Sequence, residues 1–194
     1  TLDGTLFPYT TLFRSADAGF CVPLAQRQLF LDDYGIAKID NLERTMHKPI
    51  KKGTIIRPTY PLETSLQTRS APAWDPSEKV YKLWLLVSRI ENGSGTAYVE
   101  SQDGLHWTKP NLRQKEVNGT LDNNIVTPDP AREWPANAIE NVVYDPDDPD
   151  AGRRYKGFAN CYGREPMVSP DGIHWNLLNV PILSSSDESN LSYD

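Results

Sequence analysis

A seven-residue motif occurs twice in this chain, 68 residues apart, and it limits the folds that the chain can adopt. Ser101–Trp107 reads Ser-Gln-Asp-Gly-Leu-His-Trp, and Ser169–Trp175 reads Ser-Pro-Asp-Gly-Ile-His-Trp. Asp followed by Gly favours a tight turn, because the Asp side chain accepts from nearby backbone N–H groups and Gly tolerates a positive φ. The Trp that follows can bury a large apolar area. Since both copies carry the same Asp, His and Trp, we interpret these residues as parts of a repeated turn rather than as a catalytic group.

The repeat extends upstream of both motifs. An aromatic-Asp-Pro sequence occurs at 74–76 and at 144–146, followed by Tyr-Lys at 81–82 and at 155–156. We interpret each unit as the end of one strand, a loop, a second strand and then the motif turn. The period is too long for a helical solenoid and fits a small antiparallel sheet with its loops. We therefore expect units near residues 29–66, 67–135 and 136–186, and the start of a further unit at 187–194.

Composition agrees with an all-β protein. The chain has 194 residues with 16 Pro and 12 Gly, and no stretch shows a sustained helical period. The net charge of −6 argues against a nucleic-acid partner, which usually requires a basic patch. No apolar run is long enough to span a membrane. The spacing of Cys and His predicts no metal site, no cofactor fingerprint is present, and the sequence leaves open whether Cys21 and Cys161 form a disulfide.

The first residues differ in character from the rest. Thr5–Ser15 resembles the translation of a common sequencing-adapter string, residue for residue. We therefore exclude residues 1–15 from the fold and expect residues 16–194 to form an incomplete domain. Ala16-Asp17-Ala18 could be the end of a signal-peptide cleavage site or a chance occurrence of two alanines. The location of the protein stays open, with export to the periplasm or the cell exterior as the suspected case.

Repeated four-stranded sheets of this length favour a β-propeller. The motif, with Asp four residues before Trp, resembles the blade motif of the five-bladed propeller glycosidases of families 32 and 43, which include invertases, levanases and arabinosidases. Five stretches within residues 24–194 are similar to uncharacterised bacterial proteins labelled as family 32-like hydrolases. These stretches are 29–33, 44–49, 122–126, 154–156 and 169–175. The resemblance implies an all-β propeller of the five-bladed glycosidase type, truncated here to about three blades, and a carbohydrate as the partner.

In such propellers, acidic residues near the start of the inner strands of different blades carry out glycoside hydrolysis, which requires an acid and a second carboxylate. Alignment of the repeats places Ser70, Glu140 and Ser189 at one position, and only Glu140 is acidic. We therefore predict Glu140 as the general acid, with an ion pair to a neighbouring Arg as the structural alternative. The other candidates are Asp187 and Asp33 as second carboxylates, and Glu63, Arg69, Asn141 and Glu188 as substrate contacts.

The chain also departs from the family 32 pattern. The Asn-Asp-Pro-Asn, Arg-Asp-Pro and Glu-Cys sequences that mark those enzymes are missing from it. Asp75-Pro76 and Asp145-Pro146 lie at the far end of the inner strand and repeat, so we interpret them as turns. A glycoside hydrolase-like propeller is therefore the favoured interpretation. A carbohydrate-binding propeller without catalysis and a structural propeller stay open as alternatives.

Overall fold

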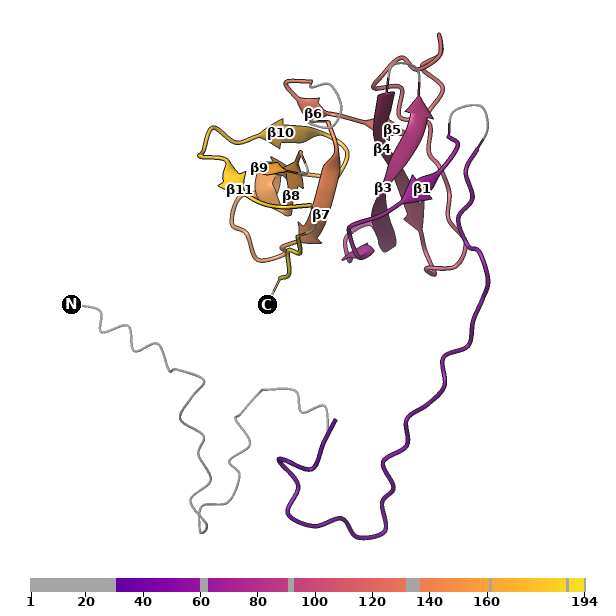
Figure 1. The fold of residues 1–194 in the computed structure, drawn as a ribbon, viewed down its shortest axis with the longest axis vertical. Helices are drawn as coiled ribbons and strands as arrows, with labels where there is room; N and C mark the ends of the chain where they lie inside the picture. Colours follow the sequence, from indigo (N-terminus) through magenta and orange to yellow (C-terminus); the bar gives the residue numbers. More distant parts are fainter. Residues whose placement is uncertain are drawn as a thin grey trace, which may run out of the picture. The chain divides into compact units, whose positions relative to one another are not determined.

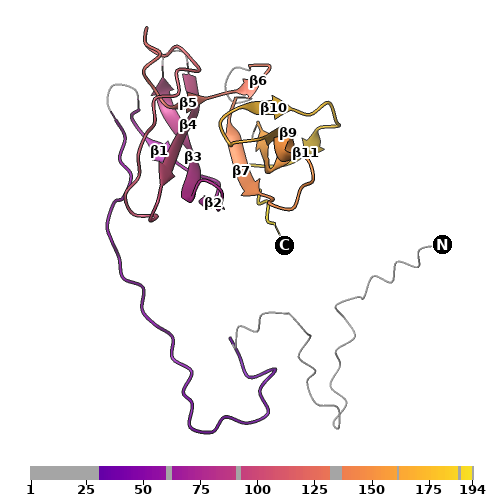
Figure 2. The ribbon, with the colours of Figure 1, turned by 180° about the vertical axis from the view of Figure 1, so that it is seen from behind.

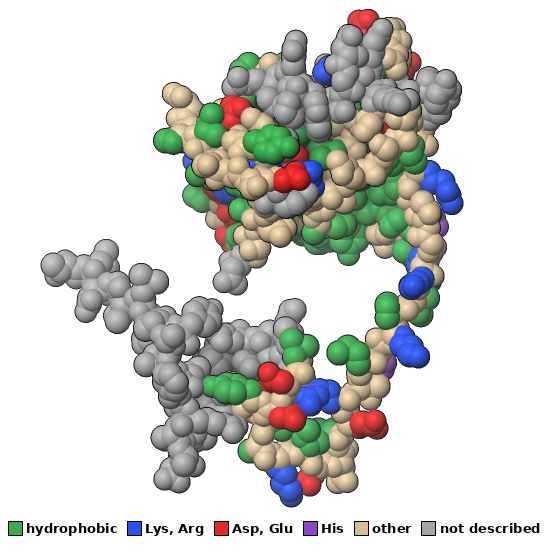
Figure 3. Space-filling model, viewed as in Figure 1, with side chains coloured by type: hydrophobic (Ala, Val, Ile, Leu, Met, Phe, Trp, Pro, Cys, Tyr) green, Lys and Arg blue, Asp and Glu red, His purple; other side chains and the backbone are tan. Residues whose placement is uncertain are grey.

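The computed structural model describes residues 31–59, 63–90, 93–131, 137–160, 162–187 and 189–193. The chain divides into two units, residues 1–50 and residues 51–194. In the first unit, the described residues form bends and irregular chain, and large apolar side chains such as Leu42 and Met46 are 80% and 89% exposed. Figure 3 shows hydrophobic, basic and acidic side chains interspersed along this stretch rather than gathered into a core. The predicted unit near 29–66 therefore stays a prediction.

The second unit contains two β-sheets, which Figures 1 and 2 show from opposite sides. The first sheet has the order β1-β3-β4-β5, and β2 also pairs with β3. Its strands are β1 (Leu66–Gln67), β2 (Ala73–Asp75), β3 (Val80–Ile90), β4 (Gly93–Ser101) and β5 (Ile125–Val126). All its pairings are antiparallel. Apolar and aromatic residues fill most of β3, including Leu83–Val87, as expected of a strand that packs on both faces.

The second sheet repeats the antiparallel part of this arrangement and adds one parallel pair, between β6 and β10. It has the order β6-β10-β9-β8-β7, and β11 also pairs with β9. Its strands are β6 (Pro128–Asp129), β7 (Ile139–Tyr144), β8 (Tyr155–Ala159), β9 (Gly163–Ser169), β10 (Trp175–Leu177) and β11 (Leu183–Ser184). A short 3-10 helix, η1 (Ala151–Arg153), precedes β8, and the described residues contain no α-helix. Tyr81 faces Ser101 in the first sheet as Tyr155 faces Ser169 in the second, so the sequence repeat is also a repeat of strand register.

The two motifs form the same turn. In the first, the side chain of Asp103 accepts from the backbone N–H groups of Leu105 and His106, each at 2.8 Å. In the second, Asp171 accepts in the same way from the residues at the equivalent positions, again at 2.8 Å. Gly104 and Gly172 have φ values of +73° and +79°, which a side chain would strain. The predicted tight turn is confirmed in both copies.

Each motif also has a histidine that closes the turn. The Nδ1 atom of His174 lies 2.7 Å from the carboxylate of Asp171, and the first copy shows the same contact at 2.6 Å. Burial of Asp171 opposes its ionisation, but backbone and side-chain hydrogen bonds from His174 outweigh that effect and lower the pKa of the carboxyl. The indole N–H of Trp175 then donates to the carbonyl of Gly172 at 2.8 Å. These residues are structural parts of the turn, as the repetition predicts.

One buried core joins the two sheets. Its buried side chains come from both sheets and are Ala73, Trp84, Tyr98, Val126, Ile139, Val142, Tyr155, Ala159, Met167 and Trp175. Trp84 lies at the centre, with edge-to-face contacts to Tyr155 and Trp175 at centroid distances of 6.0 and 5.9 Å. A second cluster includes Leu83, Leu85 and Val87, which alternate along β3 with the residues that face the second sheet.

Polar contacts fix how the two sheets meet. From β3, Lys82 Nζ donates to the carbonyl of Asp171 at 3.0 Å, and Trp84 Nε1 donates to that of Gly172 at 2.8 Å. In the opposite direction, the hydroxyl of Tyr155 donates to Asp75 at 2.5 Å. Burial raises the pKa of Asp75, but hydrogen bonds from Ser77, Tyr155 and Lys82 outweigh burial and hold it well below its usual range. The prediction of an all-β fold is therefore confirmed, and two repeated sheets are present.

Candidate functional site

Glu140 and Asn141 lie where strand β7 departs from regular pairing. Glu140 faces Phe158 across the sheet, and a β-bulge separates this pair from Val143 opposite Lys156. Asn141 has a φ of +54°, in the left-handed region that favours Gly. A bulge turns side chains away from the direction that a regular strand would give them. Glu140 and Asn141 are 1% and 2% exposed, so this irregularity places two polar side chains inside the protein.

Two arginines hold the carboxylate of Glu140. Arg164, on β9, donates from Nη1 to Oε2 of Glu140 and is itself 2% exposed at its side chain. Arg69 lies 3.5 Å from the same oxygen with a side chain 17% exposed. The side chain of Asp187 is 67% exposed and lies 3.5 Å from the other terminal nitrogen of Arg69. Two predicted carboxylates and one predicted arginine are therefore in contact.

The segment that contains Asp187 and Ser189 is tied to this cluster by its backbone. Both arginines donate to the carbonyl of Asp187 at 3.0 Å. Asn141 Nδ2 donates to the carbonyl of Ser189 at 2.6 Å and to that of Arg69 at 3.0 Å. The starts of the units at 67–135, 136–186 and 187–194 thus meet at Asn141. We call Arg69, Glu140, Asn141, Arg164 and Asp187 the Glu140 cluster.

Two acceptor atoms in the Glu140 cluster lack partners. Glu140 Oε1 and Asn141 Oδ1 are buried and make no hydrogen bond to the described residues. A buried acceptor without a partner costs about 1–3 kcal/mol. Such atoms call for an explanation. Both have almost no accessible surface, and the exposed side chain of the cluster is that of Asp187.

The remaining predicted residues lie apart from this cluster. Glu63 is 2% exposed and forms an ion pair with Lys109, while its carboxylate accepts from the backbone N–H of Thr59 at 2.9 Å. Asp33 belongs to the first unit, where it pairs with Arg44 at 2.7 Å. Glu188 and both cysteines fall outside the described residues. Four of the seven predicted site residues therefore come together, and the roles of Glu63, Asp33 and Glu188 stay predictions.

Arg164 is the member of the cluster that the sequence analysis missed. It precedes Ser169 by five residues, and the equivalent position before Ser101 is Thr96. A break in the repeat identified Glu140, and the same test applied to this position would have found Arg164. Thr96 lies beside β7, the strand that contains Glu140, since the hydroxyl of Thr96 accepts from the backbone N–H of Ile139 at 2.9 Å.

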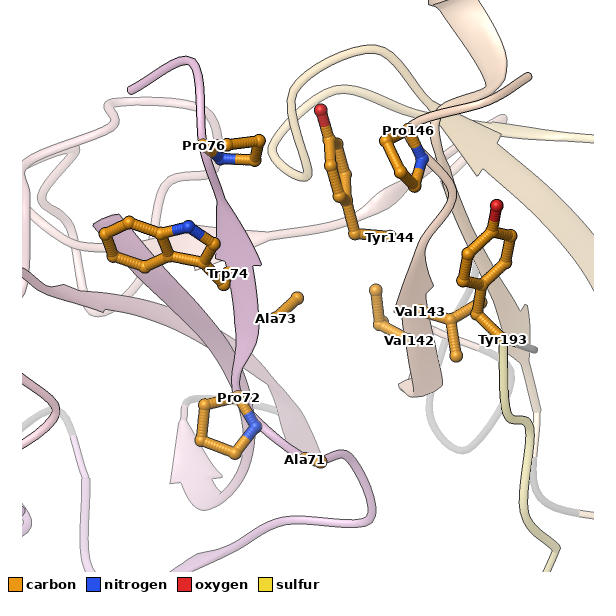
Figure 4. A pocket seen from close by; sticks show the side chains of 10 residues that line it. All are labelled: Ala71, Pro72, Ala73, Trp74, Pro76, Val142, Val143, Tyr144, Pro146 and Tyr193. Atoms are coloured by element: carbon orange, nitrogen blue, oxygen red, sulfur yellow. The ribbon is translucent and has the colours of Figure 1, made fainter. Parts of the chain in front are cut away.

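A separate cavity of about 390 Å³ lies between β2 and β7 (Figure 4). Its wall is mostly apolar, and its aromatic residues are Trp74, Tyr144 and Tyr193. Figure 4 shows Trp74 and Tyr144 on opposite sides of the hollow. The side chains that line it include no carboxylate, so the cavity lacks the groups that glycoside hydrolysis requires. We therefore place the candidate site at the Glu140 cluster and not in this cavity.

Comparison with known protein families, with curated proteins and with solved structures found no match. Among the described residues, no group of three or more His, Cys, Asp or Glu side chains is arranged to hold a metal ion. No helix in the described part of the chain has the length and apolar character needed to cross a membrane. The geometry of the Glu140 cluster is therefore the basis for a functional proposal.

Proposed function

We propose that this chain is part of a glycoside hydrolase-like β-propeller that binds an oligosaccharide or polysaccharide at the Glu140 cluster. The observation that carries the proposal is that Arg69 contacts both Glu140 and Asp187, the two carboxylates predicted from the repeat. Both carboxylates lie 3.5 Å from one guanidinium group, so they are near each other, as the two carboxylates of a glycoside hydrolase must be. The repeated antiparallel strands β2-β3-β4 and β7-β8-β9 support the propeller architecture.

The exposed carboxylate of the cluster supports a carbohydrate as the ligand. Sugar hydroxyl groups are donors, and the side chain of Asp187, which is 67% exposed, is an acceptor that such donors can reach. Oε2 of Glu140 already accepts from Arg69 and Arg164.

A carbohydrate-binding protein without catalysis is the second candidate function. The burial of Glu140 favours it, because a side chain 1% exposed and held by two guanidinium groups resembles a structural ion pair. In this alternative, Asn141 and Asp187 contact hydroxyl groups of the ligand, and no bond is broken. Both candidates place the ligand at the same cluster, and they differ in whether sugar is released.

The experiment that tests the proposal measures binding and reducing-end release on a panel of plant and microbial glycans. We expect Glu140→Gln and Asp187→Asn to abolish or strongly reduce release, whereas Glu116→Gln, at an exposed position, leaves it unchanged. Asp187 is mostly exposed, so its substitution tests the site without loss of the fold. Binding without release would select the second candidate. Release at full rate by both variants, or the absence of both binding and release, would contradict the proposal.

A further inference from the structure

A second polar site lies beside the first sheet. A cavity of about 200 Å³ is lined by the segment before β1 and by the connection between β4 and β5. None of the described residues that line it belongs to the Glu140 cluster. We call it the Glu63 cavity, after the buried carboxylate in its wall. At about 30 Å³ for each water, it has room for about seven waters or for one small polar molecule.

The connection between β4 and β5 departs from the repeat. β5 begins 18 residues after Trp107, whereas β11 begins 8 residues after Trp175. Both strands nevertheless pair with the equivalent part of the preceding long strand. The longer connection is anchored by Val117, which is 3% exposed and packs in the second hydrophobic cluster. Most polar groups of the Glu63 cavity therefore come from a stretch that the second copy of the repeat lacks.

The charges around the Glu63 cavity are already paired. The ammonium of Lys109 donates to a carbonyl and a hydroxyl of residues 57–59, each at 2.9 Å, and to Oε2 of Glu63. These contacts use all three donors of an ammonium group. The second carboxylate of the cavity, Asp122, lies 3.0 Å from Nη1 of Arg113. Because each carboxylate has its own cation, the cavity favours an uncharged ligand.

Two buried side chains in the wall keep an oxygen free. Glu63 is 2% exposed and Asn124 is 5% exposed. Glu63 accepts at Oε2, and Asn124 donates from Nδ2 to the carbonyl of Tyr98 at 2.7 Å. Glu63 Oε1 and Asn124 Oδ1 make no hydrogen bond to the described residues, yet neither is closed off from solvent as Glu140 Oε1 is. A molecule in the cavity can therefore reach both acceptors.

Asp122 adds a third acceptor to the Glu63 cavity. Its Oδ1 accepts from Asn111 Nδ2 and from Arg113 Nη1, each at 3.0 Å. Its Oδ2 accepts from none of the described residues, and the side chain is 66% exposed. Pro110 supplies an apolar ring in the same wall. Carboxylate and amide oxygens beside an apolar face match a sugar, whose hydroxyl groups donate and whose C–H groups are apolar.

We infer that the Glu63 cavity binds one neutral sugar ring, either free or as a unit of a glycan. Hydroxyl groups of the sugar donate to Glu63 Oε1, Asn124 Oδ1 and Asp122 Oδ2, and its C–H face packs against Pro110. This site uses no residue of the Glu140 cluster and breaks no bond. It therefore stands or falls independently of hydrolysis or binding at that cluster.

An NMR titration of the ¹⁵N-labelled full chain tests the inference, because the side-chain amides of Asn111 and Asn124 report on the Glu63 cavity. The neutral probes are glucose, galactose, xylose and arabinose, and the linear trisaccharides of each. Glucosamine, glucose 6-phosphate and Ca²⁺ are the charged probes. We expect at least one neutral sugar to shift both amide signals to saturation. Shifts with a trisaccharide alone assign a glycan unit, and shifts with a monosaccharide assign a free sugar.

Asp122→Asn is the variant that tests the contact. It keeps Oδ1 for its two existing donors and replaces the free oxygen by an amide group. We expect it to weaken sugar binding by about tenfold, as for the loss of one hydrogen bond to a charged acceptor. Asp40→Asn is the matched control, since Asp40 is 64% exposed and paired with Lys38 but does not line the cavity.

Three results would overturn the inference. The first is that no neutral sugar shifts the amide signals of Asn111 and Asn124. A sugar that shifts only signals of the Glu140 cluster gives this result and leaves the proposed function standing. The second is equal weakening of sugar binding by Asp122→Asn and Asp40→Asn. The third is a stronger response to a charged probe than to every neutral sugar, which would assign an ion as the ligand.

Discussion

Substitution of the two motif glycines separates the cost of the turn from the cost of the contact between the sheets. Gly104 and Gly172 have φ values of +73° and +79°, so an Ala at either position pays about 1–2 kcal/mol for the left-handed backbone. At Gly172 the added Cβ would also lie 2.6 Å from Trp84 Cζ2, whereas at Gly104 the nearest atom is 3.9 Å away. Overpacking of a core costs about 1–3 kcal/mol. We therefore expect Gly104→Ala to lower the free energy of unfolding by about 1–2 kcal/mol. Gly172→Ala should lower it by about 2–5 kcal/mol.

Equilibrium unfolding in guanidinium chloride, followed by tryptophan fluorescence, measures both values. Trp84 and Trp175 are buried and 5.9 Å apart, so their emission reports on the contact between the sheets. In a Trp84→Leu background, which removes the clashing ring, the cost of Gly172→Ala should fall to that of Gly104→Ala. Equal costs for the two glycine variants in the natural background would refute the inference that the second turn is packed against the first sheet.

Two further predictions concern charged groups. The pKa of Asp171 is lowered in the folded protein, so its contribution to stability is present above the unfolded value of about 3.9 and is lost as the pH falls through the folded value. The destabilisation caused by Asp171→Ala in chemical unfolding should therefore shrink below about pH 4, and a pH-independent difference would contradict the role of the His174 hydrogen bonds. Arg164→Met should cost about 3–5 kcal/mol because Glu140 stays buried without its closest partner, while Arg69→Met should cost less. Thermal and chemical unfolding of both variants checks this order, which equal costs would contradict.

The repeat in the sequence predicted several contacts of the structure. It predicted the two Asp-Gly turns and the matching Tyr-Lys strands. It also singled out Glu140 as an acidic residue at a position where the other copies have Ser. An ion pair between Glu140 and a neighbouring Arg was the structural alternative, and the side chains of Arg69 and Glu140 lie 3.5 Å apart. The structural alternative for Glu140, an ion pair with a neighbouring Arg, is therefore present in the structure. Arg164 was not predicted, although it too breaks the repeat, since Thr96 stands at the equivalent position; the break does not reveal that its partner is Glu140 on another strand.

The number of blades and the carbohydrate ligand stay predictions, for different reasons. The described residues contain two sheets, and those before Leu66 form no strand, so neither a third sheet nor a closed ring of sheets is observed among them. The unsatisfied acceptors of the Glu140 cluster became visible only when burial was known. Glu140 Oε1 and Asn141 Oδ1 are such atoms, and a sequence contains no measure of whether an acceptor is satisfied.

The sequence by itself determined the motif turns, because their bonds join atoms two or three residues apart. Asp171 reaches the N–H of Ile173 and of His174, and Gly172 supplies the positive φ, whatever lies nearby. Only the tertiary structure decided that Lys82 would donate to the carbonyl of Asp171, 89 residues away, and that Arg164 would hold Glu140, 24 residues away. The packing of the sheets determines these partners. A charged group that is removed from water must pair with an opposite charge or a carbonyl, and packing decides which of these lies beside it.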